Sequence, residues 1–463
     1  MFTLVCLAAF AGLVSLSLAE STNNSFECKN STSRDVDVAV IGGGASGTYA
    51  AVRLHSQDQK VVLIETKNRL GGQVNTYVDP ETKQTVDYGV NQYTNLTEAR
   101  EFLDYLQVPY LPYESEGVSL TSIDFATARV LPAPDQNATF AQMSRYMRQV
   151  RQYPYLELGF DLPDPVPEDL ALPFVEFARK YGVTSFTQTI SPAMGDVLHF
   201  PAIYVLKHWG AHMFGADFLT PANTGNQGIY DRALEVLGSS VLLSSRTRAI
   251  QRASDNQGGV QLCVDSGEGT QHIRAKRLVI AIPSPDTILY QIGLDVTDQE
   301  RSLLSQFRPI GFYTSLVRIS GIPPHRGFQN VDANEPVYRV PKLPGIYRII
   351  PKEIPGTYLI EYGAETVIPD DEVRQNIIAD VRRLQDSGAV AGGEDPEIIE
   401  FDNHSPFYPY VSGEAIRDGF YRQLNSLQGQ QNTFWTGSAF HIPDSAKLWR
   451  FTKGVMQNLT EGL

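Results

Sequence analysis

The clearest hydrophobic pattern lies near the start of the chain. Polar and apolar residues alternate from position 35 and give way to a wholly apolar stretch that ends at position 41. A strand that is buried on both faces of a parallel sheet has this pattern. Residues 48–54 continue as a helix, and residues 60–65 form a second apolar run that ends in an acid. The pattern predicts a strand, a helix and a second strand of a parallel sheet.

Glycines fill the turn between the first predicted strand and the helix. Gly42, Gly44 and Gly47 have the spacing G-x-G-x-x-G, which allows a tight turn, close approach of the backbone to a pyrophosphate, and close packing of helix on strand. Unpaired N–H groups at the helix start favour an anion. Glu65 follows about 20 residues later, at a position from which it can accept hydrogen bonds from ribose hydroxyls. The alternative interpretation is that Glu65 is only the solvated end of the second strand. In this order the elements predict a dinucleotide site.

NAD and FAD both use this arrangement, and the next segments distinguish them. Arg69, Gly71 and Gly72 resemble the R-x-G-G-R element of the flavin-containing amine oxidase superfamily, whose glycines let the chain pass beside the phosphates. Gln73 replaces the second arginine and removes one phosphate-facing charge. Residues 86–93 resemble the D-x-G segment that lies against the isoalloxazine, with a simple turn as the alternative. The resemblance therefore implies FAD and disfavours a nicotinamide enzyme.

Three later segments extend the resemblance to the superfamily. Residues 239–250 resemble the strand whose backbone reads the adenine, and residues 260–276 form a plausible hairpin before the apolar strand at 278–281. Residues 433–438 resemble the closing strand, with Ser438 where amine oxidases place a glutamate. Residues 445–449 open a final helix, which in this superfamily points its positive end at the pyrimidine side of the flavin.

The resemblance implies a set of residues in contact with FAD. They are Gly42, Gly44, Ala45, Ser46, Gly47, Glu65, Arg69, Gly71, Gly72, Gln73, Gly89, Val90, Asn91, Thr247, Gly437, Ser438, Lys447 and Leu448.

From about position 35 to its end, the chain resembles the secreted fungal FAD-dependent oxidoreductases of the beta-cyclopiazonate dehydrogenase family. Segments at 46–51, 106–110, 165–170, 419–424 and 434–437 carry this closer likeness. Its implied fold is α/β, a Rossmann-like FAD-binding domain of the glutathione-reductase type interleaved with an α+β substrate domain. We expect residues 35–110, 222–284 and 414–463 in the FAD-binding domain, and 111–221 and 285–413 in the substrate domain.

The substrate segments are rich in aromatic residues, most of which we expect in the core. Together they suit an apolar ligand; they are Tyr153, Tyr155, Phe160, Phe200, Tyr204, Trp209, Phe214, Phe307, Phe312 and Tyr313. An amine oxidase often frames its substrate nitrogen with a C-terminal Tyr or Trp, but no Tyr follows Tyr421, and Phe440 or Trp449 is the candidate substitute. His199, His208 and His212 lie in an expected helical region and form no consistent triad or metal face. No metal site, nucleophile or acid/base pair is identified.

The resemblance implies dehydrogenation or oxidative ring closure of a hydrophobic, often prenylated, small molecule by hydride transfer to the flavin. Four alternatives remain: a redox-neutral FAD-dependent isomerase, an amine oxidase, a secreted FAD-fold binding protein without turnover, and a nicotinamide enzyme. The net charge of -14 argues against nucleic acid, because phosphate binding requires a basic surface.

The first 19 residues are apolar and uncharged, and they end in a small-x-small cleavage pattern. We interpret residues 1–19 as a secretory signal, with an uncleaved membrane anchor as the alternative, and expect no stable membrane span after its removal. Six glycosylation sequons support an extracellular address: Asn23, Asn30, Asn95, Asn137, Asn403 and Asn458, of which Asn95 and Asn137 have the most accessible sequence context. Cys28 and Cys263 remain after cleavage, and either pair or stay apart.

Overall fold

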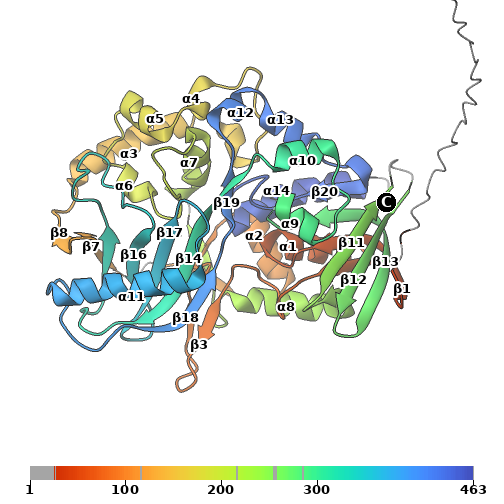
Figure 1. Cartoon of the computed structure of the whole chain (residues 1–463), viewed down its shortest axis with the longest axis horizontal. Coiled ribbons are helices and arrows are strands. Elements are labelled where there is room, and N and C mark those ends of the chain that lie inside the picture. The colour runs from red at the N-terminus through yellow and green to blue at the C-terminus, as the bar shows by residue number, and fades with distance from the viewer. Residues whose placement is uncertain are drawn as a thin grey trace, which may run out of the picture.

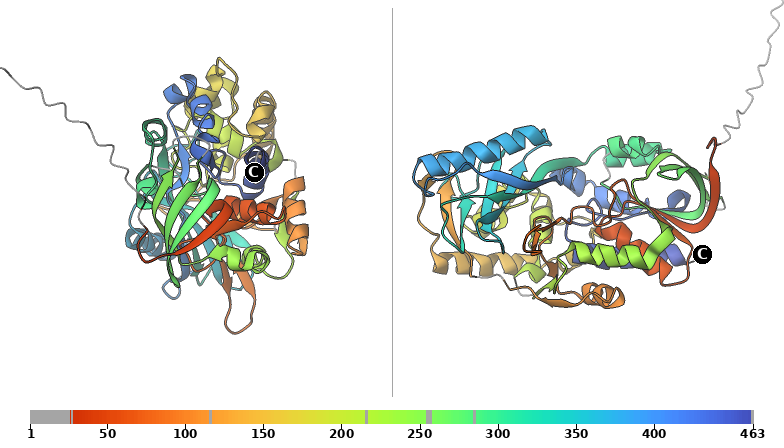
Figure 2. Two further views of the ribbon diagram at one scale, coloured as in Figure 1. Left: turned by 90° about the vertical axis from the view of Figure 1, so that its right-hand side faces the viewer. Right: turned by 90° about the horizontal axis from the view of Figure 1, so that it is seen from below.

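Two β-sheets lie side by side, with helices packed on and above them (Figure 1). The computed structural model describes residues 26, 28–114, 117–214, 217–253, 258–283 and 286–461. The expected signal at 1–19 and the sequon at Asn23 lie outside the described residues. Seen from below, the two sheets occupy opposite ends of the molecule (Figure 2).

The first sheet, which we call the nucleotide sheet, is largely parallel in its centre. Its order is β10-β2-β1-β13-β12-β11, and β20 pairs with the end of β13. The strands are β1 (Thr32–Ile41), β2 (Val61–Ile64), β10 (Val241–Leu242), β11 (Arg246–Arg252), β12 (Val260–Ser266), β13 (Gly269–Ile280) and β20 (Thr433–Trp435). The predicted hairpin is confirmed, since β12 and β13 are antiparallel neighbours.

The apolar end of β1, Val38–Ile41, is buried on both faces, as its hydrophobic pattern predicted. Val38 and Val40 face one core, whose helices α1 (Ala45–His55), α8 (Gln227–Leu237) and α14 (Ser445–Thr460) pack together. Ala39 and Ile41 face a second core. Helix α2 (Thr97–Tyr105) packs on α14, and α9 (Asp286–Gln291) and α10 (Asp298–Leu304) lie near the other face (Figure 1). Helix α13 (Phe420–Asn425) packs on α10, and α12 (Gly413–Arg417) packs on α13 and on a helix of the substrate half.

The second sheet, which we call the substrate sheet, has the order β18-β14-β17-β16-β15-β7-β8, with β19 beside β14. Its strands are β7 (Ser119–Asp124), β8 (Arg129–Val130), β14 (Arg308–Arg318), β15 (Arg326–Asn330), β16 (Gly345–Pro351), β17 (Thr357–Ala364), β18 (Glu397–Asn403) and β19 (Phe407–Tyr410). Helix α11 (Asp370–Asp386) packs its apolar side against one face (Figure 1). The other face turns toward the nucleotide sheet's loops.

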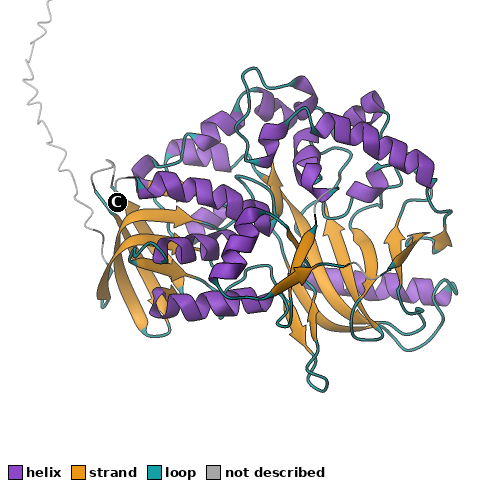
Figure 3. Ribbon diagram, turned by 180° about the vertical axis from the view of Figure 1, so that it is seen from behind, coloured by secondary structure: helices purple, strands orange, loops and turns teal. Residues whose placement is uncertain are grey.

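Short helices cover the top of the substrate sheet, as the view from behind also shows (Figure 3). They are α3 (Gln136–Val150), α4 (Glu168–Ala171), α5 (Phe174–Tyr181), α6 (Thr187–Ile190) and α7 (Ala202–His208), with the 3₁₀ turns η1 (Pro154–Glu157), η2 (Ala211–Met213), η3 (Gly238–Ser240) and η4 (Gln430–Asn432) elsewhere along the chain. Their aromatic residues share one core with both sheets.

Small strands connect the half of the molecule that contains the nucleotide sheet with the half that contains the substrate sheet. A hairpin of β3 (Thr76–Val78) and β4 (Thr85–Asp87) projects from the body and packs Val86 and Tyr88 on Leu316 and Leu359 of the substrate sheet. A three-stranded sheet of β5 (Tyr93–Thr94), β9 (Phe218–Pro221) and β6 (Tyr110–Pro112) lies beside it. The exact domain boundaries given above stay predictions.

The two remaining cysteines form a disulfide. Cys28, just before β1, is bonded to Cys263 in β12, with their Cα atoms 5.5 Å apart. The bond ties the beginning of the described chain to the antiparallel edge of the nucleotide sheet. The alternative in which the two thiols stay apart is therefore excluded in this structure.

Candidate cofactor and substrate site

The glycine turn after β1 forms a cradle. Gly42 has a φ of +99°, which favours glycine, and a Cβ on Gly47 would lie 1.8 Å from the carbonyl oxygen of Gly42. Gly44 differs from both, because the nearest atom to a Cβ built on it is the Cα of Gly72 at 3.8 Å. The protein therefore leaves space at Gly44 that a ligand can fill and that a side chain would block.

Polar groups around this turn suit a dinucleotide. The carboxylate of Glu65 is buried and accepts from the backbone N–H groups of Gly43 at 2.6 Å and Lys67 at 2.7 Å, which leaves lone pairs for ribose hydroxyls. Ser46 Oγ and Thr247 Oγ1 are buried without a hydrogen-bond partner among the described residues. Helix α1 also begins without a side-chain cap. Unpaired donors at a helix start are suited to a pyrophosphate, so the residues present fit such a cofactor.

The second glycine turn closes against the first. Gly71 donates its N–H to the carbonyl of Gly43 at 2.8 Å, and Gly71 and Gly72 both have positive φ. The Arg69 guanidinium donates to Asn75 Oδ1 at 2.5 Å and to Gln227 Oε1 at 3.2 Å. Arg69 thus holds the turn in shape, and its contact with the cofactor stays a prediction.

Gln73 joins the cofactor loops to the substrate half. Its side-chain amide donates to the backbone carbonyl of His404 at 2.9 Å. A Cβ on Gly89 would lie 2.2 Å from the Gln73 carbonyl oxygen, so glycine is required where the D-x-G segment crosses. Val90 and Asn91 follow on the cavity wall.

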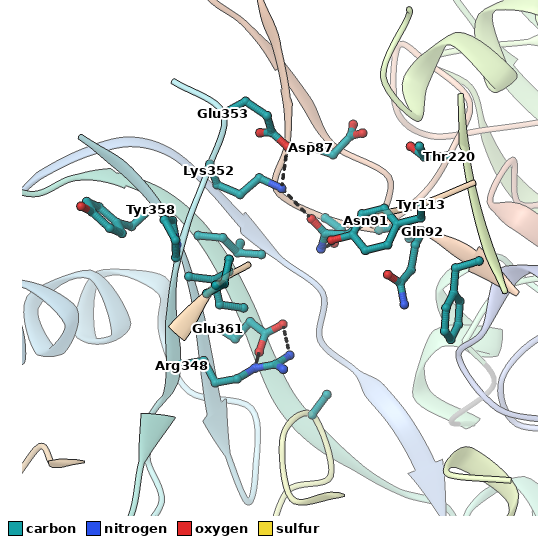
Figure 4. Close-up of a pocket in the computed structure, with 18 of the residues that line it drawn as sticks. Asp87, Asn91, Gln92, Tyr113, Thr220, Arg348, Lys352, Glu353, Tyr358 and Glu361 are labelled. Atoms are coloured by element: carbon teal, nitrogen blue, oxygen red, sulfur yellow. Dashed lines mark hydrogen bonds and ion pairs between the residues drawn. The ribbon is translucent and has the colours of Figure 1, made fainter. Parts of the chain in front are cut away.

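A cavity of about 910 Å³ separates these loops from the substrate sheet. Its size is within the range of small-molecule sites. One wall comes from residues 89–92 and 443–445, and the other comes from β16 and β17, with Asn91, Gln92 and Tyr113 facing Arg348 and Glu361 across the space (Figure 4). Of the aromatic residues singled out in the sequence, Phe312 lines the cavity, joined by Tyr113, Phe218, Tyr358 and Phe407.

The cavity face of the substrate sheet carries a polar row across four strands. Asp402, Thr314, Glu361 and Arg348 are direct cross-strand partners, so their side chains lie on one face. Arg348 binds Glu361 in a bidentate ion pair, with distances of 2.6 and 2.8 Å (Figure 4). Burial alone would lower the pKa of Arg348, but Glu361 outweighs it and the pKa is raised.

Two further charged groups lie where the D-x-G segment meets the cavity. Lys352 donates to Asn91 Oδ1 at 3.1 Å and lies 3.5 Å from Glu353 (Figure 4). Burial raises the pKa of Asp87 to about 6, although Asp87 accepts hydrogen bonds from Thr76 and the backbone N–H of Asn226. Asp87 thus caps the turn before α8 and is already occupied by protein donors.

Sequence reasoning missed a histidine–carboxylate pair. His404 lines the cavity, is 5% exposed, and places Nε2 3.2 Å from Asp402 Oδ2. The two residues are separated by one position at the end of β18, and no spacing rule marks such a pair. Only the fold reveals that this strand end lies against the cofactor loops.

Comparison with known proteins identifies the family. Residues 40–106 match the model of an NAD(P)-binding Rossmann-like domain. FAD-dependent oxidoreductase dbaF of Emericella nidulans is 34% identical over 466 residues, covering 98% of both chains. FAD-dependent oxidoreductase oblC of Cochliobolus heterostrophus is 35% identical, covering 92% of both. Beta-cyclopiazonate dehydrogenase of Aspergillus oryzae is 33% identical, covering 98% of this chain and 99% of that protein.

The chain belongs to this family of fungal FAD-dependent oxidoreductases. FAD is thus the dinucleotide of the site described above. Among solved structures, a CLA-producing fatty acid isomerase from P. acnes superposes with a TM-score of 0.71 at 18% identity, covering 92% of this chain and 99% of that chain. Wild-type putrescine oxidase bound to putrescine gives 0.63 at 15% identity, with coverages of 92% and 99%. These two likenesses concern the fold alone.

The C-terminal segment of the oxidoreductase contains several of the residues that the sequence predicts to contact FAD. Gly437 has a φ of +112°, and half-buried Ser438 follows it. Asp444 caps α14 by accepting from the backbone N–H of Lys447 at 3.0 Å. The buried Lys447 Nζ donates to the Lys207 carbonyl at 3.3 Å, so its side chain contacts protein groups. Direct contact of Ser438, Lys447 and the neighbouring Leu448 with FAD stays a prediction.

The helical placement expected for three histidines is wrong for His199 but holds for His212, which lies in a 3₁₀ helix. His208 ends α7 and lines the cavity, and burial lowers its pKa to about 4. His212 lies in the 3₁₀ turn η2, and His199 lies outside any helix, exposed and paired with Asp196. The described residues contain no group of His, Cys, Asp and Glu that could hold a metal.

Two other expectations concern the oxidoreductase's surface. Asn95 is half-buried and its side-chain oxygen accepts from Arg100, so the expectation that it is among the most accessible sequons is wrong. Asn30, Asn137 and Asn458 are exposed, and Asn403 donates to Asp370 at 2.7 Å. Within the described residues, no helix combines the length and apolar character of a membrane span.

Proposed function

We propose that this oxidoreductase dehydrogenates or oxidatively cyclises a hydrophobic small molecule in the secretory pathway or outside the cell. The observation that carries the proposal is the cavity between the D-x-G segment and the substrate sheet. A substrate in this space lies between the cofactor loops and a wall of aromatic and aliphatic side chains. The name of beta-cyclopiazonate dehydrogenase, a family member, supports the same class of reaction.

Bound FAD supplies a two-electron acceptor for hydride from an activated C–H bond. The chain's contribution is to bind, orient and exclude water. Phe312 and Phe407 line an apolar part of the cavity, whereas Arg348 and Lys352 offer N–H donors to a polar end of the substrate. An amphiphilic molecule with an apolar body and an oxygen-bearing head therefore fits this cavity.

The amine oxidase alternative is less well supported. Phe440 and Trp449, the candidate substitutes for the C-terminal aromatic wall, are both buried away from the cavity lining. Trp449 stacks on Tyr93, with ring centroids 5.1 Å apart, and its indole N–H donates to the Ala45 carbonyl. Its role is to pack α14 against the nucleotide half.

Metabolite comparison tests the proposed reaction. Deleting the gene from its host should cause one hydrophobic compound to accumulate. That compound, mixed anaerobically with the purified yellow protein, should reduce the bound flavin and appear with two hydrogens fewer. Flavin that stays oxidised while the compound is rearranged would indicate the redox-neutral isomerase. Flavin that stays oxidised with no change in the compound would favour the binding protein.

Secretion is part of the same proposal. The apolar residues 1–19, the sequons and the Cys28–Cys263 disulfide support passage through an oxidising compartment. We expect a mature chain beginning near residue 20, with N-linked glycans first at the exposed Asn30, Asn137 and Asn458. Intact-mass analysis before and after glycosidase treatment checks this expectation, and an unmodified chain that retains Met1 contradicts it.

A further inference from the structure

The structure assigns His404, oriented by Asp402, as the group that accepts a proton from the substrate while hydride leaves for the flavin. This assignment rests on the oxidation proposed above. The sequence alone identified no such acid/base pair.

The backbone of His404 is held from both halves of the molecule. Its N–H donates to the Phe312 carbonyl at 2.9 Å, and its own carbonyl accepts from the Gln73 side chain at 2.9 Å. The imidazole and Phe312 rings lie 5.8 Å apart. His404 is therefore fixed where the cofactor loop, the substrate sheet and the cavity meet.

The neighbours of the ring determine which nitrogen carries the proton. Nε2 lies 3.2 Å from Asp402 Oδ2, 3.3 Å from Asn75 Nδ2 and 3.4 Å from Thr314 Oγ1. The Asn75 amide nitrogen can only donate, and it already donates to Asp402 and to the Gln73 carbonyl. Of the two remaining neighbours the carboxylate is the stronger acceptor, so it keeps the proton on Nε2. Nδ1 has no bonded partner among the described residues and is left as the proton acceptor.

Asp402 is held as an anion. Burial by itself raises its pKa, but the contacts with His404, Lys67 and Asn75 outweigh burial, and the pKa is lowered. Lys67 Nζ lies 3.8 Å from Asp402 Oδ1, and Asn75 donates to Oδ2 at 2.7 Å. An ionised Asp402 also stabilises the imidazolium that forms when Nδ1 takes a proton.

Charged and titratable groups from several neighbouring elements lie near the pair. Lys67 and Arg69 come from the cofactor loop, with Arg69 reaching the pair through Asn75. Tyr88 follows β4, and its phenol interacts electrostatically with the Asp402 carboxylate. Glu361 and Arg348 continue the polar row beyond Thr314 and neutralise each other.

The other ionisable groups of the cavity are less suited to this role. Asp87 already accepts protein hydrogen bonds, and Arg348 is paired. His208 has its pKa lowered to about 4 by burial, with Lys447 adding to the effect. Among the described histidines that line the cavity, His404 alone contacts a carboxylate.

The reaction balances with one proton acceptor. A C–H bond of the substrate breaks, and its electron pair leaves as hydride to the flavin, which is reduced. A neighbouring O–H, N–H or acidic C–H bond breaks, its proton goes to Nδ1 of His404, and its electron pair forms the new double bond or ring bond of the oxidised product. The proton then passes to cavity water.

Two substitutions test the pair against a surface pair of the same composition. His404→Gln and Asp402→Asn are compared with His199→Gln, which removes the histidine of the exposed His199–Asp196 pair. The probe is the compound that accumulates in the deletion strain, mixed anaerobically and followed by flavin absorbance across pH. FAD content and melting temperature identify variants that fail to fold or load.

We expect His404→Gln to retain FAD and to reach half of its maximal rate at a probe concentration within about threefold of the wild-type value. Its maximal rate of flavin reduction should be roughly 10²–10⁴-fold lower than that of wild type. Because a proton acceptor is lost when it is protonated, wild type should slow at acid pH, and this fall in rate should disappear in His404→Gln. His199→Gln should behave as wild type. A wild-type rate and pH profile in His404→Gln would overturn the assignment.

A second readout does not depend on turnover. Nitrogen-15 NMR of selectively labelled histidine should show the His404 proton on Nε2 in the FAD-loaded protein, and Asp402→Asn should change this tautomer distribution. A proton on Nδ1 in wild type would also overturn the assignment.

The experiment separates failure of this inference from failure of the proposed function. If wild-type flavin is not reduced, the proposed function fails and this inference fails with it. If wild-type flavin is reduced and only the His404 predictions fail, the proposed function stands.

Discussion

The cofactor half and the substrate half of the site use different parts of the chain for recognition. Around Gly42 to Gly47 the ligand space is bordered by backbone N–H groups and missing side chains, and a single acid, Glu65, is held by backbone donors. On the substrate sheet, charged side chains form the cavity face, and the Arg348–Glu361 pair crosses two strands. Recognition by backbone groups depends on the exact local conformation of one turn. Recognition by side chains depends on different strands lying next to each other in the fold.

This difference explains why the two halves tolerate change differently. In the glycine turn one added carbon atom either clashes with the backbone, as at Gly47, or occupies the space left for the ligand, as at Gly44. A charged pair on a sheet is disrupted by removing one partner and is restored by removing both. The following predictions test this contrast, beginning with the largest effect.

Gly44→Ala should abolish FAD binding without unfolding the protein. The added Cβ meets only the Gly72 Cα at 3.8 Å, so the chain has room for it, but it occupies the path of the pyrophosphate. Flavin absorbance after purification and melting of the FAD-free protein measure the two effects. Gly454→Ala on α14 is the control, because a Cβ there has no atom within 4 Å. A fully yellow Gly44→Ala protein would contradict the placement of the motif.

Arg348→Met should lower the free energy of unfolding by about 3–5 kcal/mol, because it leaves the Glu361 carboxylate buried and unpaired. The double variant Arg348→Met/Glu361→Met should recover most of this loss. Urea unfolding at a fixed FAD concentration measures both. Arg318→Met removes an exposed pair with Glu397 on the same sheet and should cost about 1 kcal/mol or less. Equal costs for the two arginines would contradict the contrast.

Glu65→Ala should weaken FAD binding by roughly tenfold to a hundredfold. The substitution removes an acceptor for the ribose and leaves the Gly43 and Lys67 N–H groups unpaired, at a cost of about 1.5–3 kcal/mol. Fluorescence titration of the FAD-free protein with FAD gives the dissociation constant. Glu65→Gln keeps one acceptor oxygen and should lose less. Unchanged affinity in Glu65→Ala would remove this residue from the ribose site.

The same contrast decides what the sequence could predict. Strands β1 and β2, the β12–β13 hairpin and the start of α14 at Ser445 were predicted because each depends on a short, contiguous pattern. The contact of Gln73 with His404 joins positions 331 residues apart and has no local signature. His404 and Asp402 likewise become a pair facing the cofactor only when β18 lies against residues 67–75.

The smallest predicted effect concerns Asp87, which connects the two halves. Burial raises its pKa from 3.8 to about 6, so the folded state binds the proton more tightly than the unfolded chain does. The stability that this preference adds is fully present below about pH 4 and is lost as the pH rises through about 6. Asp87→Asn has no proton to lose. Without FAD, its free energy of unfolding relative to wild type should therefore rise by about 1–2 kcal/mol between pH 4 and pH 7.5. This range is less than the full shift implies, because the carboxyl is partly open to cavity water. Urea unfolding at a series of pH values measures the difference.

Asp35→Asn is the control of opposite sign, since Arg274 lowers the pKa of that exposed carboxyl and its substitution should lose stability as the pH rises. A flat or falling difference for Asp87→Asn would mean that its bonds to Thr76 and Asn226 outweigh its burial.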